Sequence, residues 1–254
     1  MRLHVDEHGD GHPLLLLNGL GYANWAWQRQ LPELSQTFRC IAVENRGTGR
    51  SPKPPGPYAI EEMADDAAAV LDGRRAHVCG YSMGGYIAQA LALRHPGLVE
   101  RLVLVCTATG GPSVVPAPRE TYASWLAIAG RPPHEFARAT QPLSFRPGWS
   151  EEHPDEFEAL LRDRLEFPTP PECWRAQYDA CADWNARVTP VEKIEAPTLV
   201  VHGDADRVVP YQNAVEVARR IPGARFETFA GAGHLLFIEE APRFNAMVTS
   251  FLTD

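Results

Sequence analysis

Short runs of apolar residues recur along the chain, and each is followed by residues that favour turns. The runs are PLLLLN (13–18), CIAVEN (40–45), HVCGYS (77–82), RLVLVC (101–106) and TLVVHGD (198–204), and RFETF (225–229) is a further strand-like run. Apolar runs of this length are typical of parallel strands that are buried on both faces of a sheet. We therefore predict a series of buried strands that end in loops.

Helical patterns lie between most of these runs. IEEMADDAAAVLD (60–72) has acidic residues in its first turns and apolar residues at helical spacing, and NAVEVARRIPG (213–223) ends at a Pro/Gly break. Strands that alternate with helices build an α/β fold. The pattern predicts a doubly wound, mostly parallel sheet.

The alternation fails between Thr107 and Thr189. This segment contains four of the six tryptophans and helix-length fragments such as DEFEALLRDRLEF (155–167), but no strand-like run. We predict a helical cap over residues 107–189, inserted into a core of residues 1–106 and 190–254. Long insertions in compact domains usually carry function, so we expect the cap to line a pocket rather than only to connect strands.

The aromatic residues of the predicted cap are candidates for an apolar acyl or ring pocket, with packing as the alternative role for each. They are Tyr122, Trp125, Phe145, Trp149 and Trp174.

Composition and charge narrow the class of protein. The chain has 254 residues, 44% apolar content and a net charge of -8, with acidic and basic residues interspersed, which argues against a nucleic-acid partner. Its five cysteines form no C-x-x-C pair and suit reduced thiols better than a disulfide framework. The first residues lack the apolar stretch of a signal peptide, and LLLL (14–17) is too short to cross a bilayer. We expect a cytoplasmic protein without a membrane partner, while its oligomeric state stays open.

HVCGYSMGGYIAQALALRH (77–95) places Ser82 between a strand-like and a helix-like segment. A serine acts as a nucleophile when its hydroxyl is exposed, close to a base and near amide donors for an oxyanion. A sharp strand-to-helix turn supplies the exposure, but it crowds the positions two before and two after the serine, which here are Gly80 and Gly84. The alternative is an ordinary glycine-rich turn with a serine at a helix cap.

Two backbone amides are candidate donors for the oxyanion hole. The N–H of Met83 lies at the start of the helix that follows Ser82. The N–H of Leu20 follows Gly19, which allows a tight turn after the strand in LLLLNGLGYANWAW. For this second segment the alternative is a plain glycine turn.

His234, in FAGAGHLLFIEEAP, is the candidate base, because it lies between the last strand-like run and the terminal helix. The imidazole needs a carboxylate to orient it, and Asp204 or Asp206 in TLVVHGDADRVVP can supply one. The preceding strand end, LVLVCTATGG, has no acid. His202 with these two aspartates also forms an H-x-D-x-D string that raises a metal site as an alternative, which no second ligand cluster supports.

Five motifs together resemble the α/β-hydrolase family, and the resemblance covers nearly the whole chain. NGLG resembles its His-Gly oxyanion segment, ENRGTGRS its D-x-R-G-x-G-x-S loop, GYSMGG its nucleophile elbow, HGDADRVVP its acid loop and GAGH its histidine loop. The family's acid stands three residues after the glycine, which implies Asp206 rather than Asp204. Asn18 replaces the usual histidine and Glu44 the usual aspartate, but neither is a triad position.

The size of the chain and its cap look most similar to the small esterase, enol-lactonase and C–C hydrolase group. This resemblance implies an enzyme without metal or organic cofactor that hydrolyses an ester or lactone of a small, largely apolar substrate. His234 would take the proton of Ser82, Asp206 would orient the imidazole, and the amides of Leu20 and Met83 would hold the oxyanion. C–C bond hydrolysis, perhydrolysis and acyl transfer on the same triad stay open. So does a receptor-like ligand-binding protein with little turnover.

Overall fold

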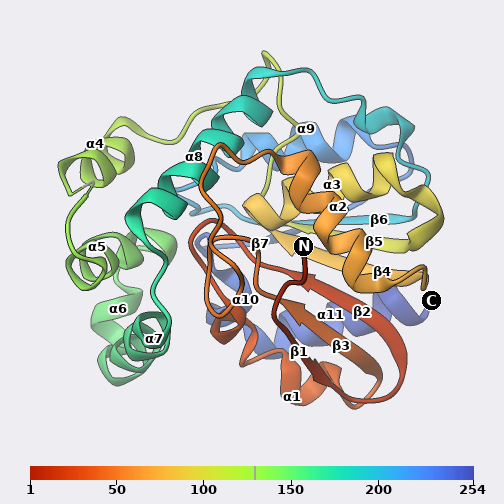
Figure 1. The fold of residues 1–254 in the computed structure, drawn as a ribbon, viewed down its shortest axis with the longest axis horizontal. Coiled ribbons are helices and arrows are strands. Elements are labelled where there is room, and N and C mark those ends of the chain that lie inside the picture. Colours follow the sequence, from red (N-terminus) through yellow and green to blue (C-terminus); the bar gives the residue numbers. More distant parts are fainter. Residues whose placement is uncertain (129) are drawn as a thin grey trace.

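The structure, a computed structural model, describes residues 1–128 and 130–254. Within these residues seven strands form one sheet, in the spatial order β1-β3-β2-β4-β5-β6-β7 (Figure 1). The strands are β1 (Val5–His8), β2 (His12–Leu17), β3 (Phe38–Val43), β4 (Ala76–Tyr81), β5 (Val99–Val105), β6 (Thr198–Gly203) and β7 (Arg225–Phe229). Strands β2 to β7 pair in parallel, so their carboxyl ends meet at one edge of the sheet. The predicted doubly wound, mostly parallel fold is confirmed.

Strand β1 was not predicted from the sequence. It pairs antiparallel with β3, at the edge of the sheet, and its residues are half-buried or exposed. Because an edge strand buries little surface, the segment VDEH carries no apolar run that would mark it. Its position depends on pairing with β3, which sequence patterning does not report.

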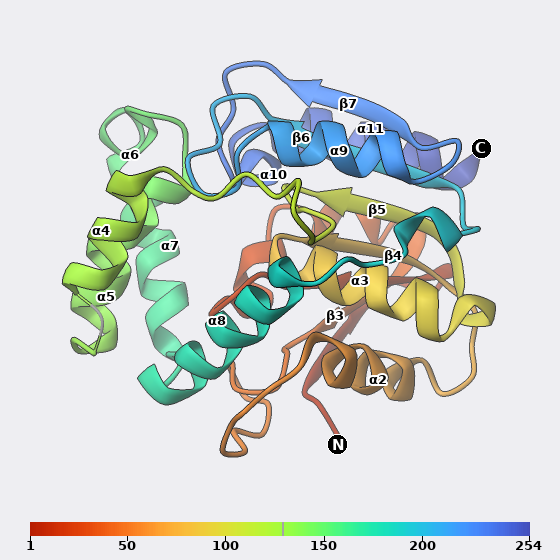
Figure 2. The ribbon, with the colours of Figure 1, turned by 90° about the horizontal axis from the view of Figure 1, so that it is seen from above.

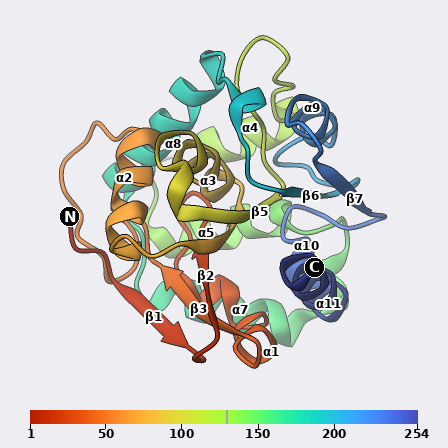
Figure 3. The ribbon, with the colours of Figure 1, turned by 90° about the vertical axis from the view of Figure 1, so that its right-hand side faces the viewer.

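Helices cover both faces of the sheet (Figure 3). One face carries α2 (Ile60–Leu71), α3 (Met83–Arg94) and α9 (Gln212–Arg220), and the other carries α1 (Leu31–Leu34), α10 (Leu236–Glu239) and α11 (Ala241–Thr253). Alternate residues of the inner strands enter different cores. In β2, Leu15 and Leu17 pack on the α2 and α3 side, whereas Leu14 and Leu16 pack on the α11 side. This double burial explains why the strands read as continuous apolar runs.

The chain between β5 and β6 forms helices in its described residues. They are α4 (Arg119–Ala127), α5 (Pro133–Thr140), α6 (Trp149–Glu152), α7 (Pro154–Glu166) and α8 (Pro171–Ala186). Two 3-10 turns, Gln141–Ser144 and Val191–Lys193, lie in the same segment, and two others, Asn24–Trp27 and Pro96–Leu98, lie before β5. Helices α4 to α7 stand at one end of the molecule, while α8 returns alongside α2 and α3 (Figure 2). The helical content agrees with the sequence analysis, and the division into core and cap stays a prediction.

None of the described helices combines the length and the apolar character that crossing a bilayer requires.

Candidate active site

Ser82 stands at the junction of β4 and α3 with φ 55° and ψ -122°. A non-glycine residue at positive φ costs about 1–3 kcal/mol and persists only where its surroundings hold it. The turn brings the helix directly onto the sheet. A Cβ at Gly80 would lie 2.2 Å from the Gly84 carbonyl oxygen, and a Cβ at Gly84 would lie 2.2 Å from that of Leu17. Both positions therefore require glycine.

His234 and Asp206 meet at the same edge of the sheet. His234 Nδ1 lies 2.7 Å from Asp206 Oδ2, and both side chains are buried. Asp206 Oδ1 accepts the N–H groups of Val208 and Val209, at 2.7 and 2.9 Å. Burial by itself would raise the pKa of Asp206, but the charge and hydrogen bonds of His234 and His202 outweigh it and hold that pKa far below its usual range. The carboxylate is thus ionised and directed at the imidazole.

His202 and Asp204 have other partners. His202 Nε2 lies 2.8 Å from the Val209 carbonyl oxygen and 3.2 Å from Asp206 Oδ2. A carbonyl oxygen only accepts, so this Nε2 carries a proton. Asp204 Oδ1 accepts the N–H of Gly231 instead, at 2.6 Å. Among the described residues, the H-x-D-x-D string therefore does not direct its three side chains at a common point.

The sequence analysis did not select Cys106, which lies beside the His234–Asp206 pair. It follows β5 with φ 48° and is fully buried, and its sulfur lies within 4.8 Å of ligand atoms of Asp206 and His234. Burial raises the pKa of the Cys106 thiol well above its usual range, so this thiol is protonated. The sequence signal that marks Cys106 is its position at the end of β5, the strand that pairs with β6.

The two candidate oxyanion donors lie in backbone segments next to Ser82. Met83 is the first residue of α3, and Gly19–Tyr22 form a tight turn closed by a hydrogen bond from the Tyr22 N–H to the Gly19 carbonyl oxygen, at 3.2 Å. A Cβ at Gly19 would lie 3.2 Å from the Cβ of Ser82, so the backbone of this turn lies against the serine. We call residues 19–22 the oxyanion turn.

One cavity of about 340 Å³ brings these residues together. It is lined by Leu20, Ser82, Met83 and His234, and most of its remaining wall is apolar or aromatic. Asp206 is not among the lining residues, because it sits behind the imidazole that it contacts. An imidazole held by a carboxylate at the same cavity as a serine can activate the serine hydroxyl to attack a small apolar molecule.

Three of the five cap aromatics that the sequence selected line this cavity, namely Tyr122, Trp125 and Trp174. Phe145 and Trp149 do not line it and have the alternative, packing role. Their rings stack on each other with centroids 4.0 Å apart, both are buried, and they belong to the core on the α11 side of the sheet. An apolar ring fills a core as readily as it lines a pocket, and packing alone separates the two outcomes.

Arg164 is the one arginine or lysine, and the one side chain of fixed charge, among the described residues lining this cavity. Its guanidinium donates to Gln141 Oε1 at 2.8 Å and lies 4.9 Å from the centroid of the Tyr22 ring. No described carboxylate forms an ion pair with it, whereas many other arginines of the chain are paired. Arg164 also lines a second cavity of about 350 Å³ between α4, α5, α7 and α8. A lone arginine on a helix gives no sequence signal, so the sequence analysis did not select it.

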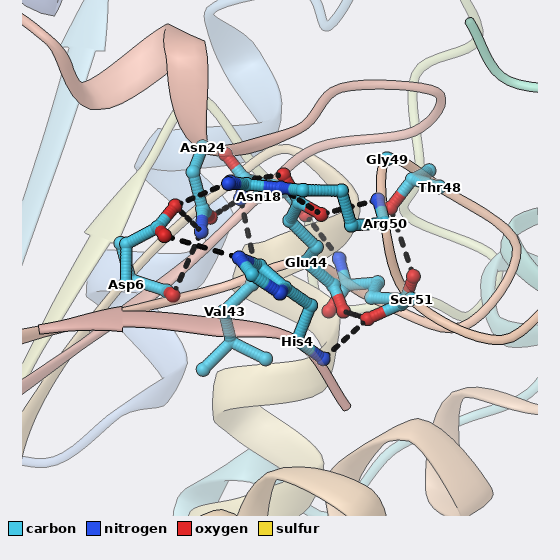
Figure 4. A network of polar contacts seen from close by, with 12 residues as sticks. His4, Asp6, Asn18, Asn24, Val43, Glu44, Thr48, Gly49, Arg50 and Ser51 are labelled. Carbon is cyan, nitrogen blue, oxygen red and sulfur yellow. Dashed lines mark hydrogen bonds and ion pairs between the residues drawn. The ribbon is translucent and has the colours of Figure 1, made fainter. Parts of the chain in front are cut away.

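The two departures from the family pattern lie in a polar network beside the oxyanion turn (Figure 4). Asn18 Nδ2 donates to the Val43 carbonyl oxygen at 2.8 Å and to Asn24 Oδ1 at 3.0 Å. The Glu44 carboxylate accepts the backbone N–H of Arg50 at 2.5 Å and its guanidinium at 3.1 Å. Neither Asn18 nor Glu44 lines the cavity. The Asn18 side chain joins the end of β2 to the end of β3, and the Glu44 carboxylate closes the loop at residues 44–51.

Comparisons with known proteins agree with this architecture. A family model described as alpha/beta hydrolase fold matches residues 12–241. The chain is 32% identical to a 2-hydroxymuconate semialdehyde hydrolase of Pseudomonas sp. (strain CF600), over 100% of this chain and 91% of that protein. It is 34% identical to a putative carbamate hydrolase RutD of Variovorax paradoxus (strain S110), over 99% of this chain and 96% of that protein. The crystal structure of the enol-lactonase from Burkholderia xenovorans LB400 superposes with a TM-score of 0.86 and 30% identity, covering 99% of this chain and 96% of that one.

Proposed function

Because the chain belongs to the α/β hydrolase fold family, we propose that it is a serine hydrolase that cleaves a carboxylic ester or lactone of a small, largely apolar substrate. The observation that carries the proposal is the 2.7 Å contact between His234 and Asp206, with His234 and Ser82 on one apolar cavity. The similarity to an enol-lactonase supports the choice of an ester or lactone bond.

The reaction proceeds through an acyl-enzyme. His234 takes the proton of Ser82 as Oγ attacks the substrate carbonyl, and Asp206 holds the ring with its Nδ1 proton toward the carboxylate. The amides of Leu20 and Met83 stabilise the oxyanion. The imidazolium then protonates the leaving oxygen, and a water activated by His234 releases the acid and restores Ser82.

The test compares wild type with Ser82→Ala on p-nitrophenyl esters from acetate to decanoate, together with an enol-lactone and a vinylogous diketone. We expect an active wild type and a loss of at least about 10³-fold in kcat for Ser82→Ala. The preferred acyl chain length or ring then indicates the size of the acyl pocket. Wild-type kcat in the variant would overturn the role of Ser82. An inactive wild type would favour a protein that binds its ligand without turnover.

A second chemistry on the same triad is C–C bond hydrolysis, and Arg164 is the observation that favours it. The chain is similar to a 2-hydroxymuconate semialdehyde hydrolase, and a muconate semialdehyde keeps one carboxylate. The guanidinium of Arg164, which has no carboxylate partner among the described residues, lines the cavity that also holds Ser82 and is suited to bind such a group.

Two substrates that differ in one carboxylate test whether Arg164 binds the substrate of a C–C bond hydrolase. For a vinylogous diketone that carries a carboxylate, Arg164→Gln should lower kcat/KM by about 10- to 100-fold, which corresponds to one charge-assisted hydrogen bond. The methyl ester of the same diketone should be turned over almost equally by both proteins. Arg162→Gln, at an exposed position of the same helix, is the control. Equal losses on both substrates would argue against a carboxylate site at Arg164.

A further inference from the structure

The helix α8 reaches the oxyanion turn through one fully buried side chain, Gln177. Its Oε1 accepts the backbone N–H of Gly21 at 2.8 Å, although the two residues are 156 positions apart in the chain. Its Nε2 donates to the carbonyl oxygen of Arg46 at 2.7 Å. One amide therefore ties α8 to the oxyanion turn and, at the same time, to the loop that follows β3.

Gly21 is also in contact with Trp174 and Thr169, from the same part of the chain. Its φ is +71°, and a Cβ at this position would lie 2.8 Å from the indole of Trp174. The hydroxyl of Thr169, just before α8, donates to the Gly21 carbonyl oxygen at 3.2 Å. The N–H and the C=O of this residue thus both bond to side chains from the segment between β5 and β6, and not to the sheet.

The oxyanion turn has few internal restraints of its own. One hydrogen bond, from Tyr22 to Gly19, closes it, and glycines occupy two of its four positions. Glycine adds backbone freedom, so the direction of the Leu20 N–H depends on what anchors the turn. The anchor at its central peptide is Gln177.

We propose that Gln177 is a positioning residue, which fixes the oxyanion turn to α8 so that the Leu20 amide is aligned only while α8 is docked. This inference rests on the proposed function. It makes the cap a part of the catalytic geometry as well as a wall of the pocket. Loss of one oxyanion donor costs about 10²–10³ in kcat, and a displacement of about 1 Å costs about 10².

The experiment uses the full-length protein with Gln177→Met, which preserves the length of the side chain and removes both hydrogen bonds. On the best ester of the panel we expect kcat to fall by about 10- to 100-fold with KM changed by less than about threefold, because the alignment matters in the transition state. The inhibition constant of an alkylboronic acid, whose tetrahedral adduct with Ser82 needs the oxyanion hole, should rise in parallel with the loss in kcat. That of the product carboxylic acid should not.

Two further variants separate positioning from general loosening of α8. Thr169→Val removes the weaker tether to Gly21 and should lower kcat by about two- to fivefold, again with little change in KM. Cys173 lies one helical turn before Gln177, and its side chain packs beside Gly47 and not on the oxyanion turn. Cys173→Ala should therefore change kcat by less than about twofold.

The outcomes distinguish the inference from the function on which it rests. An inactive wild type would contradict both the proposed function and the positioning role. If wild type is active and Gln177→Met has the same kcat, only the positioning role is overturned. Equal losses of kcat in Cys173→Ala and Gln177→Met would also overturn it, because they would assign the effect to helix docking. If Gln177→Met does not fold, Thr169→Val decides, and an unchanged kcat in that variant would contradict the proposal.

Discussion

Two carboxylates follow the same strand, β6, and their side chains have separate partners. Asp206 Oδ2 contacts His234, while Oδ1 is held by the backbone amides of Val208 and Val209. Asp204 accepts the N–H of Gly231 from the exposed side of the same loop. Of the two, the proposed chemistry therefore depends on Asp206, whose orientation is set by the loop that it begins.

Replacement of each aspartate by asparagine tests this assignment. Asp206→Asn should lower kcat by about 10³- to 10⁴-fold, because an amide cannot accept the His234 Nδ1 proton and also satisfy both backbone donors. Asp204→Asn should stay within about threefold of wild type. The measurement is kcat on the best ester at neutral pH, with circular dichroism to verify the fold. A larger loss in Asp204→Asn would reverse the assignment.

At the scale of elements, the site depends on the close approach of α3 to the carboxyl ends of β2 and β4. The backbone of Gly84, in the first turn of α3, leaves no room for a Cβ against the Leu17 carbonyl oxygen. This approach places Ser82 and Met83, the first residue of α3, in the wall of the cavity. Gly97, which follows the same helix, has open space around it and no positive φ.

A pair of Gly→Ala variants separates these two environments. Gly84→Ala should lower the free energy of unfolding by at least about 1–3 kcal/mol, because the helix must move away from the sheet. It should also lower kcat, since Ser82 and Met83 move with the helix. Gly97→Ala should leave kcat unchanged and alter stability by less than about 1 kcal/mol. Urea unfolding gives the free energies of unfolding. Equal values for the two variants would show that a Cβ at Gly84 does not clash with the Leu17 carbonyl oxygen.

At the scale of the whole molecule, the sheet separates the cavity from a titratable group at its opposite edge. His77 lies near the start of β4, is buried, and has its ring centroid 4.6 Å from that of His12. Burial, and then the charge of His12, lower the pKa of His77 to about 4; Arg75 and Arg101 add to this lowering and Glu100 opposes it. His77 is therefore neutral in the fold at neutral pH.

This lowered pKa predicts a loss of stability in weak acid. Between pH 6.5 and about 4 the unfolded chain binds a proton at His77 that the folded chain does not, so stability falls as the pH falls through this range. His77→Phe removes the titration and should reduce the pH dependence of the free energy of unfolding by about 1–3 kcal/mol. His8→Phe, at an exposed edge position, is the control. An unchanged dependence in His77→Phe would show that other groups cause the acid sensitivity.

Local sequence was sufficient for most of the core and for the candidate triad. Strands β2 to β6 were predictable because burial on both faces requires unbroken apolar runs, and Ser82 was predictable because its turn requires glycine at fixed offsets. Edge strand β1 has neither signal. The motif order then led to His234 and Asp206, which the structure places in contact.

Only the tertiary structure decided which cap residues face the cavity. Trp174 lines it while Phe145 and Trp149 stack within the core, although the three are equivalent as apolar rings. Arg164 and Gln177 had no sequence signal at all, because their roles depend on partners brought near by folding and not on neighbours in the chain. Periodicity and turn chemistry act over a few residues, so the sequence alone determined the inner strands of the sheet and the turn at Ser82. Contacts between distant parts of the chain, such as the one between Gly21 and Gln177, decided how the segment between β5 and β6 meets the rest of the fold.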